Sequence, residues 1–383
     1  RKKDRKTGRI TLPPTSFQGC PSLRPRKAHS MSQDLRGTLN FMRFTVPRVD
    51  EIIQASHVLN IPLKYSFRGL QMREVLLIEG TQGPGEWAAF TEYPDEVAAV
   101  WLCSALEQAF DGGVAVPPDN ADRLRVNATF PALDVEDIEN WWGLFPGVSS
   151  AKVKVGEDPS DFSADVERIQ RIRQVVGSNV ALRLDANARW TVEQATQALT
   201  SLAEFSIDYV EQPVSSLHEM VELRSRLEGT GIRLAADELI RRDHALDEVI
   251  TTSAADIAVL KVSPLGGIRP TLELARRAHD AGIEVVISSG LETSVGLSWG
   301  ARAAAILREE FGSLPDAGLG TSVFLETDPV TEPLLVSDGS IAVTAPSLDL
   351  DAVEAVRANP ERTRWWHDRL SRCLPRALEL LES

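Results

Sequence analysis

The sequence predicts an α/β protein built on a (β/α)8 barrel of the TIM type, with an α+β unit beside it. From residue 125 onward, short apolar runs alternate with segments whose apolar residues recur at i, i+3 and i+4. There are eight such runs, spaced at roughly 25 residues, about the length of one βα unit. A doubly wound sheet is the alternative. It requires a glycine-rich phosphate turn after its first strand, and none follows that strand here.

The eight runs are the expected barrel strands. They lie at residues 125–130, 151–155, 180–185, 207–213, 232–238, 256–261, 284–290 and 318–324. The segments between them, such as 163–177 and 191–205, have the period of amphipathic helices and end at a glycine or a turn. The barrel domain is therefore expected to span residues 123–322.

Three further segments flank the barrel. Residues 1–30 are basic and have no apolar pattern, so we expect a disordered tail, with Met31 as the start of translation. Residues 31–122 combine strand-like runs, broken by Gly and Pro, with two helical stretches, which indicates an α+β unit. Residues 323–383 contain a hairpin-like piece and an amphipathic helix, and we expect them to pack with residues 31–122 beside the barrel.

Composition narrows the possible partners. The 383 residues carry a formal net charge of -14, which disfavours nucleic acid as a partner because such binders need a basic surface. No apolar run is long enough to span a membrane. The three cysteines are far apart and form no C-x-x-C pair, which suits a reducing cytoplasm.

Charged residues stand at the ends of consecutive predicted strands. The third, fourth and fifth runs carry Asp185, Glu211 and Asp237 at their ends, and the sixth ends in Lys261, with separations of 26, 26 and 24 residues. Since each separation corresponds to one βα unit, these side chains are expected at the C-terminal rim of the barrel, where active sites of this fold are built.

The three carboxylates indicate a metal site. Carboxylates that lie close together cannot all stay ionised without a compensating cation. A hard divalent cation with oxygen ligands supplies that charge, and Mg²⁺ keeps some waters for a substrate to replace. We therefore expect Mg²⁺, with Mn²⁺ able to substitute.

Lys152 and Lys154 alternate with valines in the second run, so both lysines point to one face of that strand. A metal that binds a carboxylate stabilises the enediolate formed when the α-proton leaves. A second ammonium and a divalent cation disfavour the charged form of a nearby lysine. We expect Lys152 to lower the pKa of Lys154, the base, with Lys261 on the opposite side of the metal.

Each of these residues, taken alone, also has an ordinary structural interpretation. Asp185 could be a helix N-cap, Asn187 a turn residue, and Glu211 a residue that simply ends its strand. Asp237 and Glu238 could be solvent-exposed residues at the start of a helix, and Lys261 a strand end that reaches water. Lys152 and Lys154 could belong to a half-exposed strand. These interpretations are independent of one another, whereas a metal site predicts all of these residues at one rim, so we favour the metal site.

The ordered set resembles the enolase superfamily, muconate-lactonising subgroup. The family pattern K-x-K, D-x-N, E-Q-P, D-E and K appears here as Lys152/Lys154, Asp185/Asn187, Glu211, Asp237/Glu238 and Lys261. That family places a capping domain, made of the N-terminal segment and the C-terminal tail, over the barrel rim. The resemblance implies this role for residues 31–122 and 323–383.

Within the subgroup, the stretches "FRGLQMREVLLI" at 67, "SSGLETSVG" at 288 and "GLGT" at 318 are similar to the o-succinylbenzoate synthases of menaquinone biosynthesis, actinobacterial type. This implies a lyase that dehydrates a small-molecule carboxylate, 2-succinyl-6-hydroxy-2,4-cyclohexadiene-1-carboxylate, to 2-succinylbenzoate. It further implies that Lys154 removes the proton and returns it to the departing hydroxyl, and that Lys261 stabilises the intermediate from the opposite face. The resemblance also implies that Asn187 and Glu238 orient the metal ligands. The residues implied to hold the succinyl carboxylate are Ser288, Ser289, Gly290, Glu292, Thr293, Gly318, Leu319 and Gly320.

Three other classes of function remain open at this point. Within the same superfamily, an N-succinylamino acid racemase, a dipeptide epimerase or a muconate cycloisomerase would use the same lysines. A non-catalytic barrel kept as a binding scaffold would be expected to lack a ligand or Lys154, and none is missing. A Schiff-base aldolase would use one lysine without the three carboxylates.

Overall fold

The computed structural model describes residues 44–67, 69–115, 122–158, 161–241 and 245–382. The tail predicted at residues 1–30 and the start predicted at Met31 lie outside these ranges. Among the helices of the described ranges, none is both long and apolar enough to cross a membrane.

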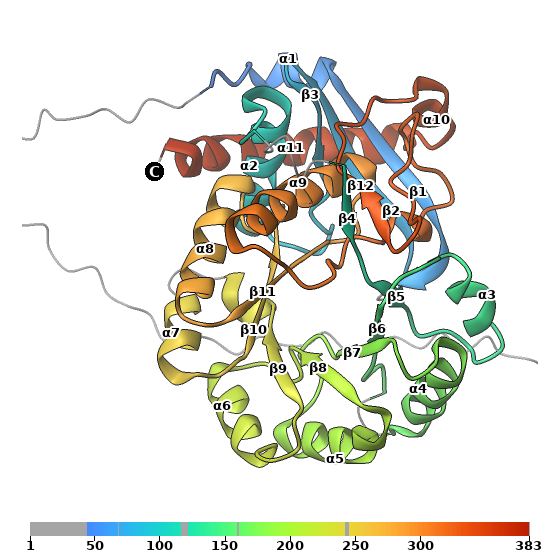
Figure 1. The fold of residues 1–383 in the computed structure, drawn as a ribbon. Helices are drawn as coiled ribbons and strands as arrows, with labels where there is room; N and C mark the ends of the chain where they lie inside the picture. Colours follow the sequence, from blue (N-terminus) through green and yellow to red (C-terminus); the bar gives the residue numbers. More distant parts are fainter. Residues whose placement is uncertain (1–43, 68, 116–121, 159–160, 242–244, 383) are drawn as a thin grey trace, which may run out of the picture. The chain divides into compact units, whose positions relative to one another are not determined.

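Seven parallel strands form the central sheet, in the order β11-β10-β9-β8-β7-β6-β5 (Figure 1). The strands are β5 Ala128–Phe130, β6 Ser150–Lys154, β7 Ala181–Asp185, β8 Ile207–Glu211, β9 Arg233–Ala236, β10 Ile257–Lys261 and β11 Glu284–Ser288. Nearly all of their residues are buried, as in parallel strands that are covered on both faces. The predicted fold class, an α/β TIM-type barrel with a second unit, is confirmed.

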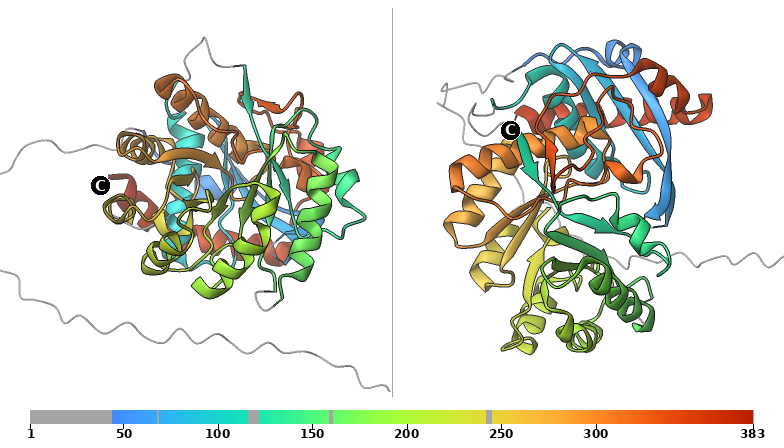
Figure 2. Two further views of the ribbon diagram at one scale, coloured as in Figure 1. Left: turned by 60° about the horizontal axis from the view of Figure 1, so that its bottom comes forward. Right: turned by 45° about the vertical axis from the view of Figure 1, so that its right-hand side comes forward.

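Helices follow most of these strands and lie outside them in Figures 1 and 2. They are α4 Ser163–Val176, α5 Val192–Leu202, α6 Leu217–Arg226, α7 Ala245–Thr252, α8 Ile268–Asp280 and α9 Ser294–Phe311. The sequence marks two helix starts directly, because Thr191 with Gln194 and Ser216 with Glu219 form capping boxes. Shorter helical turns are α3 Ile138–Trp142, η3 Ala203–Phe205, η4 Glu238–Arg241 and η5 Ser322–Phe324.

The eighth predicted run, residues 318–324, does not form a regular strand. Extended pairing is limited to two isolated parallel bridges, Val126 with Ala317 and Ser288 with Gly318, which connect β11 to the segment before β5. A 3-10 helix, η5, follows. A Cβ on Gly318 would lie 2.4 Å from Ser288 Oγ and 3.1 Å from Ser288 Cβ, so the two segments approach each other closely where the chain closes the barrel.

The first predicted run, residues 125–130, divides into two strands. Its beginning belongs to β4 Arg123–Arg125, which pairs antiparallel with β12 Ser340–Ala342 of the C-terminal segment. Its end is β5, which pairs with β6. The two strands belong to different sheets, so one apolar run in the sequence contributes to two sheets.

The N-terminal unit is an antiparallel sheet, β1 Ser56–Phe67, β2 Leu70–Gly80 and β3 Gly83–Trp87, with helices against it. Those helices are α1 Val49–Gln54, α2 Asp95–Leu106, the π-helix η1 Glu107–Asp111, and α11 Pro360–Glu382 from the C-terminal end of the chain. Trp366 of α11 is fully buried and makes an edge-to-face contact with Trp87 of β3, at a centroid distance of 5.2 Å. Residues from both ends of the described chain thus share one apolar core. We call the sheet β1–β3, the helices that pack against it and the residues that connect them the capping unit. The limits given above for the predicted domains stay predictions.

Candidate active site

The two lysines of β6 point into the barrel because side chains alternate along a strand. Val153 and Val155 pack with the helices outside, among residues such as Ile169 and Ile172 of α4. Lys152, on the opposite face of the strand, is only 6% exposed. The half-exposed strand that a lysine pair would ordinarily indicate is therefore wrong for this segment.

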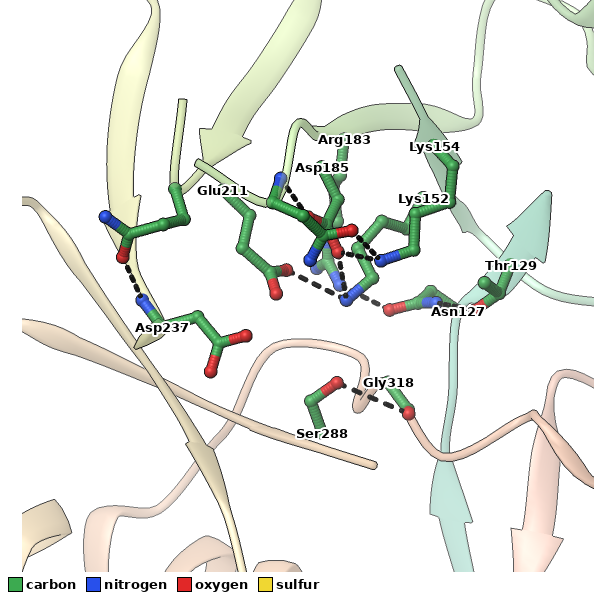
Figure 3. A network of polar contacts seen from close by, with 12 residues as sticks. Asn127, Thr129, Lys152, Lys154, Arg183, Asp185, Glu211, Asp237, Ser288 and Gly318 are labelled. Carbon is green, nitrogen blue, oxygen red and sulfur yellow. Dashed lines mark hydrogen bonds and ion pairs between the residues drawn. The ribbon is translucent and has the colours of Figure 1, made fainter. Parts of the chain in front are cut away.

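Strand register brings the predicted residues together. Lys154 lies opposite Asp185 in the pairing of β6 with β7, and Asp185 lies opposite Glu211 in the pairing of β7 with β8. Asp237 follows the last residue of β9, and Lys261 ends β10. Figure 3 shows how the labelled carboxylates and the lysines of β6 face one another.

Two of the carboxylates pair with the lysines of β6. Lys154 Nζ lies 2.5 Å from Asp185 Oδ2, and Lys152 Nζ lies 2.8 Å from Glu211 Oε2 and 3.7 Å from Asp185 Oδ2. Asp185 and Glu211 are almost completely buried, so these ion pairs are shielded from water. The next helix, α5, takes Thr191 as its N-cap, so the N-cap interpretation of Asp185 is wrong.

The third carboxylate, Asp237, is paired with two cations. Lys261 Nζ lies 2.5 Å from its Oδ2. The guanidinium of Arg241 donates hydrogen bonds to both carboxylate oxygens of Asp237, with Nη2 at 2.6 Å from Oδ1 and 2.7 Å from Oδ2. Both Asp237 and Lys261 are buried, so neither the solvated helix entry nor the strand end in water describes them.

Burial and the neighbouring charges set the pKa values of the pairs. Burial favours the neutral form of Asp185, but Lys154, Lys152 and Lys261 outweigh it and hold the pKa of Asp185 below its ordinary value. Burial, together with the charge of Asp185, raises the pKa of Glu211 to about 7. The site thus contains carboxyl groups whose pKa values are shifted in opposite directions.

The two lysines of β6 also differ from each other. Burial lowers the pKa of Lys154, and Lys152 lowers it further, although Asp185 opposes both effects. The expected influence of Lys152 has the predicted sign, but burial is the larger cause. For Lys152, burial is outweighed by Glu211 and Asp185, which raise its pKa. Lys154 is therefore the lysine of the pair that loses its proton more easily.

Asn187, Glu238 and Gln212 lie beside these groups. Asn187 has a φ of +46°, as a turn residue would, and its Oδ1 accepts a hydrogen bond from Lys154 Nζ at 2.9 Å. Its Nδ2 donates to Glu238 Oε1 at 3.3 Å. Gln212 was not among the predicted site residues. Its side-chain oxygen accepts a hydrogen bond from the backbone N–H of Asp237 at 3.0 Å. These contacts orient the loops that carry the charged groups.

A pocket opens above this cluster, lined by both the barrel and the capping unit. The capping unit contributes aromatic side chains, which are Phe67, Phe90, Tyr93 and Trp101. The barrel contributes charged side chains, which are Lys152, Lys154, Asp185, Arg241 and Lys261, together with the loops after β11 and around Gly318. Glu211 and Asp237 are not part of the pocket lining. The ring centroid of Phe67 lies 5.1 Å from Lys154 Nζ, so an apolar wall covers the lysine.

The residues implied to hold the succinyl carboxylate fall into two groups. Those that line the pocket are Ser288, Ser289, Gly290 and Gly318. Those outside its lining are Glu292, Thr293, Leu319 and Gly320. Glu292 accepts a hydrogen bond from the N–H of Gly290, and Thr293 donates to Glu86 of β3. Substrate binding by either group stays a prediction.

Sequence reasoning missed Arg241 and the four aromatic residues. Arg241 follows Asp237 by only four residues, and the 3-10 helix η4, Glu238–Arg241, turns the chain so that the two side chains meet. That spacing was a signal within the sequence. The aromatic residues had none, because they reach the site from the capping unit through tertiary packing.

The donor chemistry of the site fits a hard divalent cation. Three carboxylates come from consecutive strand ends, and Oε1 of Glu211 is buried without a hydrogen-bond partner. Within the described part of the chain, no three His, Cys, Asp or Glu side chains converge closely enough to hold an ion as they stand, since each carboxylate faces a lysine or an arginine. Asp185, Glu211 and Asp237 could hold such an ion, and their role as metal ligands stays a prediction.

Two family matches cover the two parts of the chain. Residues 145–358 match the enolase C-terminal domain-like family, and residues 58–109 match the enolase N-terminal domain-like family. The first match alone covers more than half of the chain.

Proteins of known function are similar over most of the chain. The o-succinylbenzoate synthase of Mycobacterium tuberculosis is 40% identical over 330 residues, which are 86% of this chain and 96% of that protein. The o-succinylbenzoate synthase of Mycobacterium marinum is also 40% identical, over 85% of this chain and 95% of that protein.

Solved structures share the fold at lower identity. The muconate lactonizing enzyme of Pseudomonas fluorescens superimposes with a TM-score of 0.66 at 22% identity, covering 79% of this chain and 98% of that one. The L-Ala-D/L-Glu epimerase of Bacillus subtilis gives a TM-score of 0.63 at 23% identity, covering 76% of this chain and 96% of that one.

Proposed function

The chain belongs to the enolase superfamily, as its ordered motifs predicted, and on this premise we propose that it is an o-succinylbenzoate synthase. The reaction would be the dehydration of 2-succinyl-6-hydroxy-2,4-cyclohexadiene-1-carboxylate to 2-succinylbenzoate in menaquinone biosynthesis. The observation that carries the proposal is the 40% identity with enzymes of that activity over nearly their whole length. The buried lysines beside the carboxylates support the chemistry.

Members of this superfamily typically depend on magnesium, with a lysine or histidine as base. We propose Asp185, Glu211 and Asp237 as ligands for Mg²⁺, with Mn²⁺ as a substitute. When bound, the metal supplies electrostatic stabilisation to the negative charge that develops on the substrate carboxylate. A reducing cytoplasm stays the predicted location.

The proposed roles of the lysines follow from their surroundings. Neutral Lys154 takes the proton α to the carboxylate, and the resulting ammonium returns that proton to the departing hydroxyl, which leaves as water. Lys261, on β10, contributes positive charge from another side of the pocket. The aromatic residues of the capping unit exclude water from the lysine.

The proposal is tested by assaying the purified protein with the cyclohexadiene substrate, following the formation of the aromatic product by its absorbance. We expect turnover with Mg²⁺, loss of turnover after dialysis against EDTA, and recovery when Mg²⁺ is returned. Turnover at the full rate in metal-free buffer would contradict the metal site. No turnover in any buffer would contradict the synthase.

Racemisation of succinylamino acids is the second candidate, because it needs a proton donor and acceptor on opposite faces of one carbon. Lys154 on β6 and Lys261 on β10 both line the pocket, and three strands lie between them in the sheet. Assaying succinylamino acids beside the cyclohexadiene substrate separates the two activities.

Lys261→Arg distinguishes the roles of the two lysines. Arginine keeps the positive charge but hardly releases a proton, so we expect the variant to retain part of the dehydration and to lose any racemase activity. The measurement is kcat for each substrate, with Lys261→Ala as the comparison. Equal loss of both activities in Lys261→Arg would mean that Lys261 transfers a proton in the dehydration as well.

A further inference from the structure

The loop between β11 and α9, residues 289–293, combines pocket lining with an unfavourable backbone conformation. Ser289, Gly290 and Leu291 line the pocket. Leu291 has a φ of +65°, in the left-handed region that a leucine rarely adopts. Such a conformation persists only where the surrounding structure holds it in place. The contacts of this loop therefore determine the shape of one pocket wall.

Arg73 of β2 holds the loop by its carbonyl groups. This side chain is 2% exposed; its Nε donates to the carbonyl oxygen of Leu291 at 2.9 Å, and its Nη2 donates to that of Gly290 at 3.2 Å. The same Nη2 donates to the carbonyl oxygen of Ala88, after β3. The guanidinium also lies 4.3 Å from the ring centroid of Phe90, another residue of the pocket wall. One buried cation thus joins the capping unit to the loop.

Glu86 of β3 holds the other end of the loop. Its carboxylate accepts hydrogen bonds from the N–H of Thr293 at 3.0 Å, from the hydroxyl of Thr293 at 2.5 Å and from the N–H of Gly296 at 2.8 Å. These donors lie at the start of α9, where backbone N–H groups lack partners within the helix. Glu86 is 2% exposed, so its hydrogen bonds are shielded from water.

Packing leaves the loop little room to move. A Cβ on Gly290 would lie 2.6 Å from Cη2 of Trp101, which belongs to α2 of the capping unit. A Cβ on Gly296 would lie 2.6 Å from Glu292 Cβ and 3.0 Å from Glu86 Oε2. Three elements of the capping unit, β2, β3 and α2, are therefore in close contact with the loop and the start of α9.

We propose that Arg73 and Glu86 are positioning residues that hold loop 289–293 in the conformation that forms one wall of the pocket, so that removing either side chain weakens the binding of the substrate. Burying polar side chains such as these is costly unless they are hydrogen-bonded, as both are here. Only a planar guanidinium offers donors in directions that reach three carbonyl groups at once. The kinetic part of this inference rests on the proposed synthase function, whereas the loop contacts do not.

Hydrogen exchange tests the loop contacts without any assay of activity. We expect Arg73→Met and Glu86→Gln to raise the exchange rate of backbone amides in residues 289–296 by about tenfold or more, the factor that corresponds to 1.4 kcal/mol. The control is Arg173→Met in α4. Arg173 also donates to three carbonyl groups, those of Gly177, Val180 and Phe205, but before β7 and β8, at the opposite end of the barrel. Unchanged exchange in both test variants would overturn the proposal.

Steady-state kinetics tests the consequence for the substrate. Loss of binding shared by ground state and transition state raises KM and leaves kcat unchanged, so we expect KM in Arg73→Met to rise by about tenfold with kcat changed by about twofold at most. Arg73→Lys keeps the charge but not the planar arrangement of several donors. Its KM should lie between the KM of Arg73→Met and that of the wild type. The control Arg173→Met should match the wild type in both constants.

The outcomes separate this inference from the proposed function. An inactive wild-type protein with the expected exchange result contradicts the synthase and leaves the loop contacts supported. A drop in kcat without a change in KM overturns the proposed role in substrate affinity. If Arg73→Met does not fold, Glu86→Gln and Arg73→Lys decide the same question, since unchanged KM and exchange in both would overturn it.

Discussion

Lys154→Ala is expected to lower kcat for dehydration by about 10⁴-fold or more. One residue acting as a general acid or base typically contributes 10²–10⁴-fold, and Lys154 is proposed to act first as base and then as acid. Lys152 does not replace it easily, because Lys152 pairs with Glu211 at 2.8 Å and its pKa is raised. The measurement is kcat with saturating substrate and Mg²⁺.

The control for Lys154→Ala is Lys64→Ala, which removes an exposed lysine of β1 and should leave kcat unchanged. Exchange of the α-proton for deuterium in a slow substrate analogue reports on proton abstraction alone. If Lys154→Ala exchanges that proton at the wild-type rate while Lys261→Ala does not, then Lys261 is the base and the assignment is reversed.

Glu211→Gln is expected to weaken Mg²⁺ binding by about 100-fold or more, since even altering groups that support a metal ligand typically costs 10–100-fold. Glutamine preserves the size of the side chain and its hydrogen bond to Lys152, but it removes the negative charge that would face the metal. Isothermal titration with Mg²⁺ measures the affinity directly. Loss of dehydration should accompany the loss of metal binding.

The matched control is Glu204→Gln, a change of the same chemistry at an exposed position of η3. Its Mg²⁺ affinity and its activity should equal those of the wild type. A Glu211→Gln protein that binds Mg²⁺ as tightly as the wild type, with an unchanged thermal melting curve, would remove Glu211 from the set of ligands.

The sequence by itself was sufficient to predict the barrel and the arrangement of its charged residues. Both depend on local periods that the backbone imposes, namely two residues along a strand and about one βα unit between strands. The period of two places Lys152 and Lys154 on one face, and the spacing of 26 residues places Asp185 and Glu211 on neighbouring strands.

Only the tertiary structure decided how the pocket is closed and held. Arg73 and Leu291 are 218 residues apart, and their contact depends on how the capping unit packs on the barrel. The same holds for Trp101, which reaches the loop from α2. The eighth run differs from a strand for a related reason, since Gly318 meets Ser288 at a distance set by closure of the sheet. A periodic pattern describes one element at a time, whereas these contacts depend on the shapes of two elements that meet only in the folded chain.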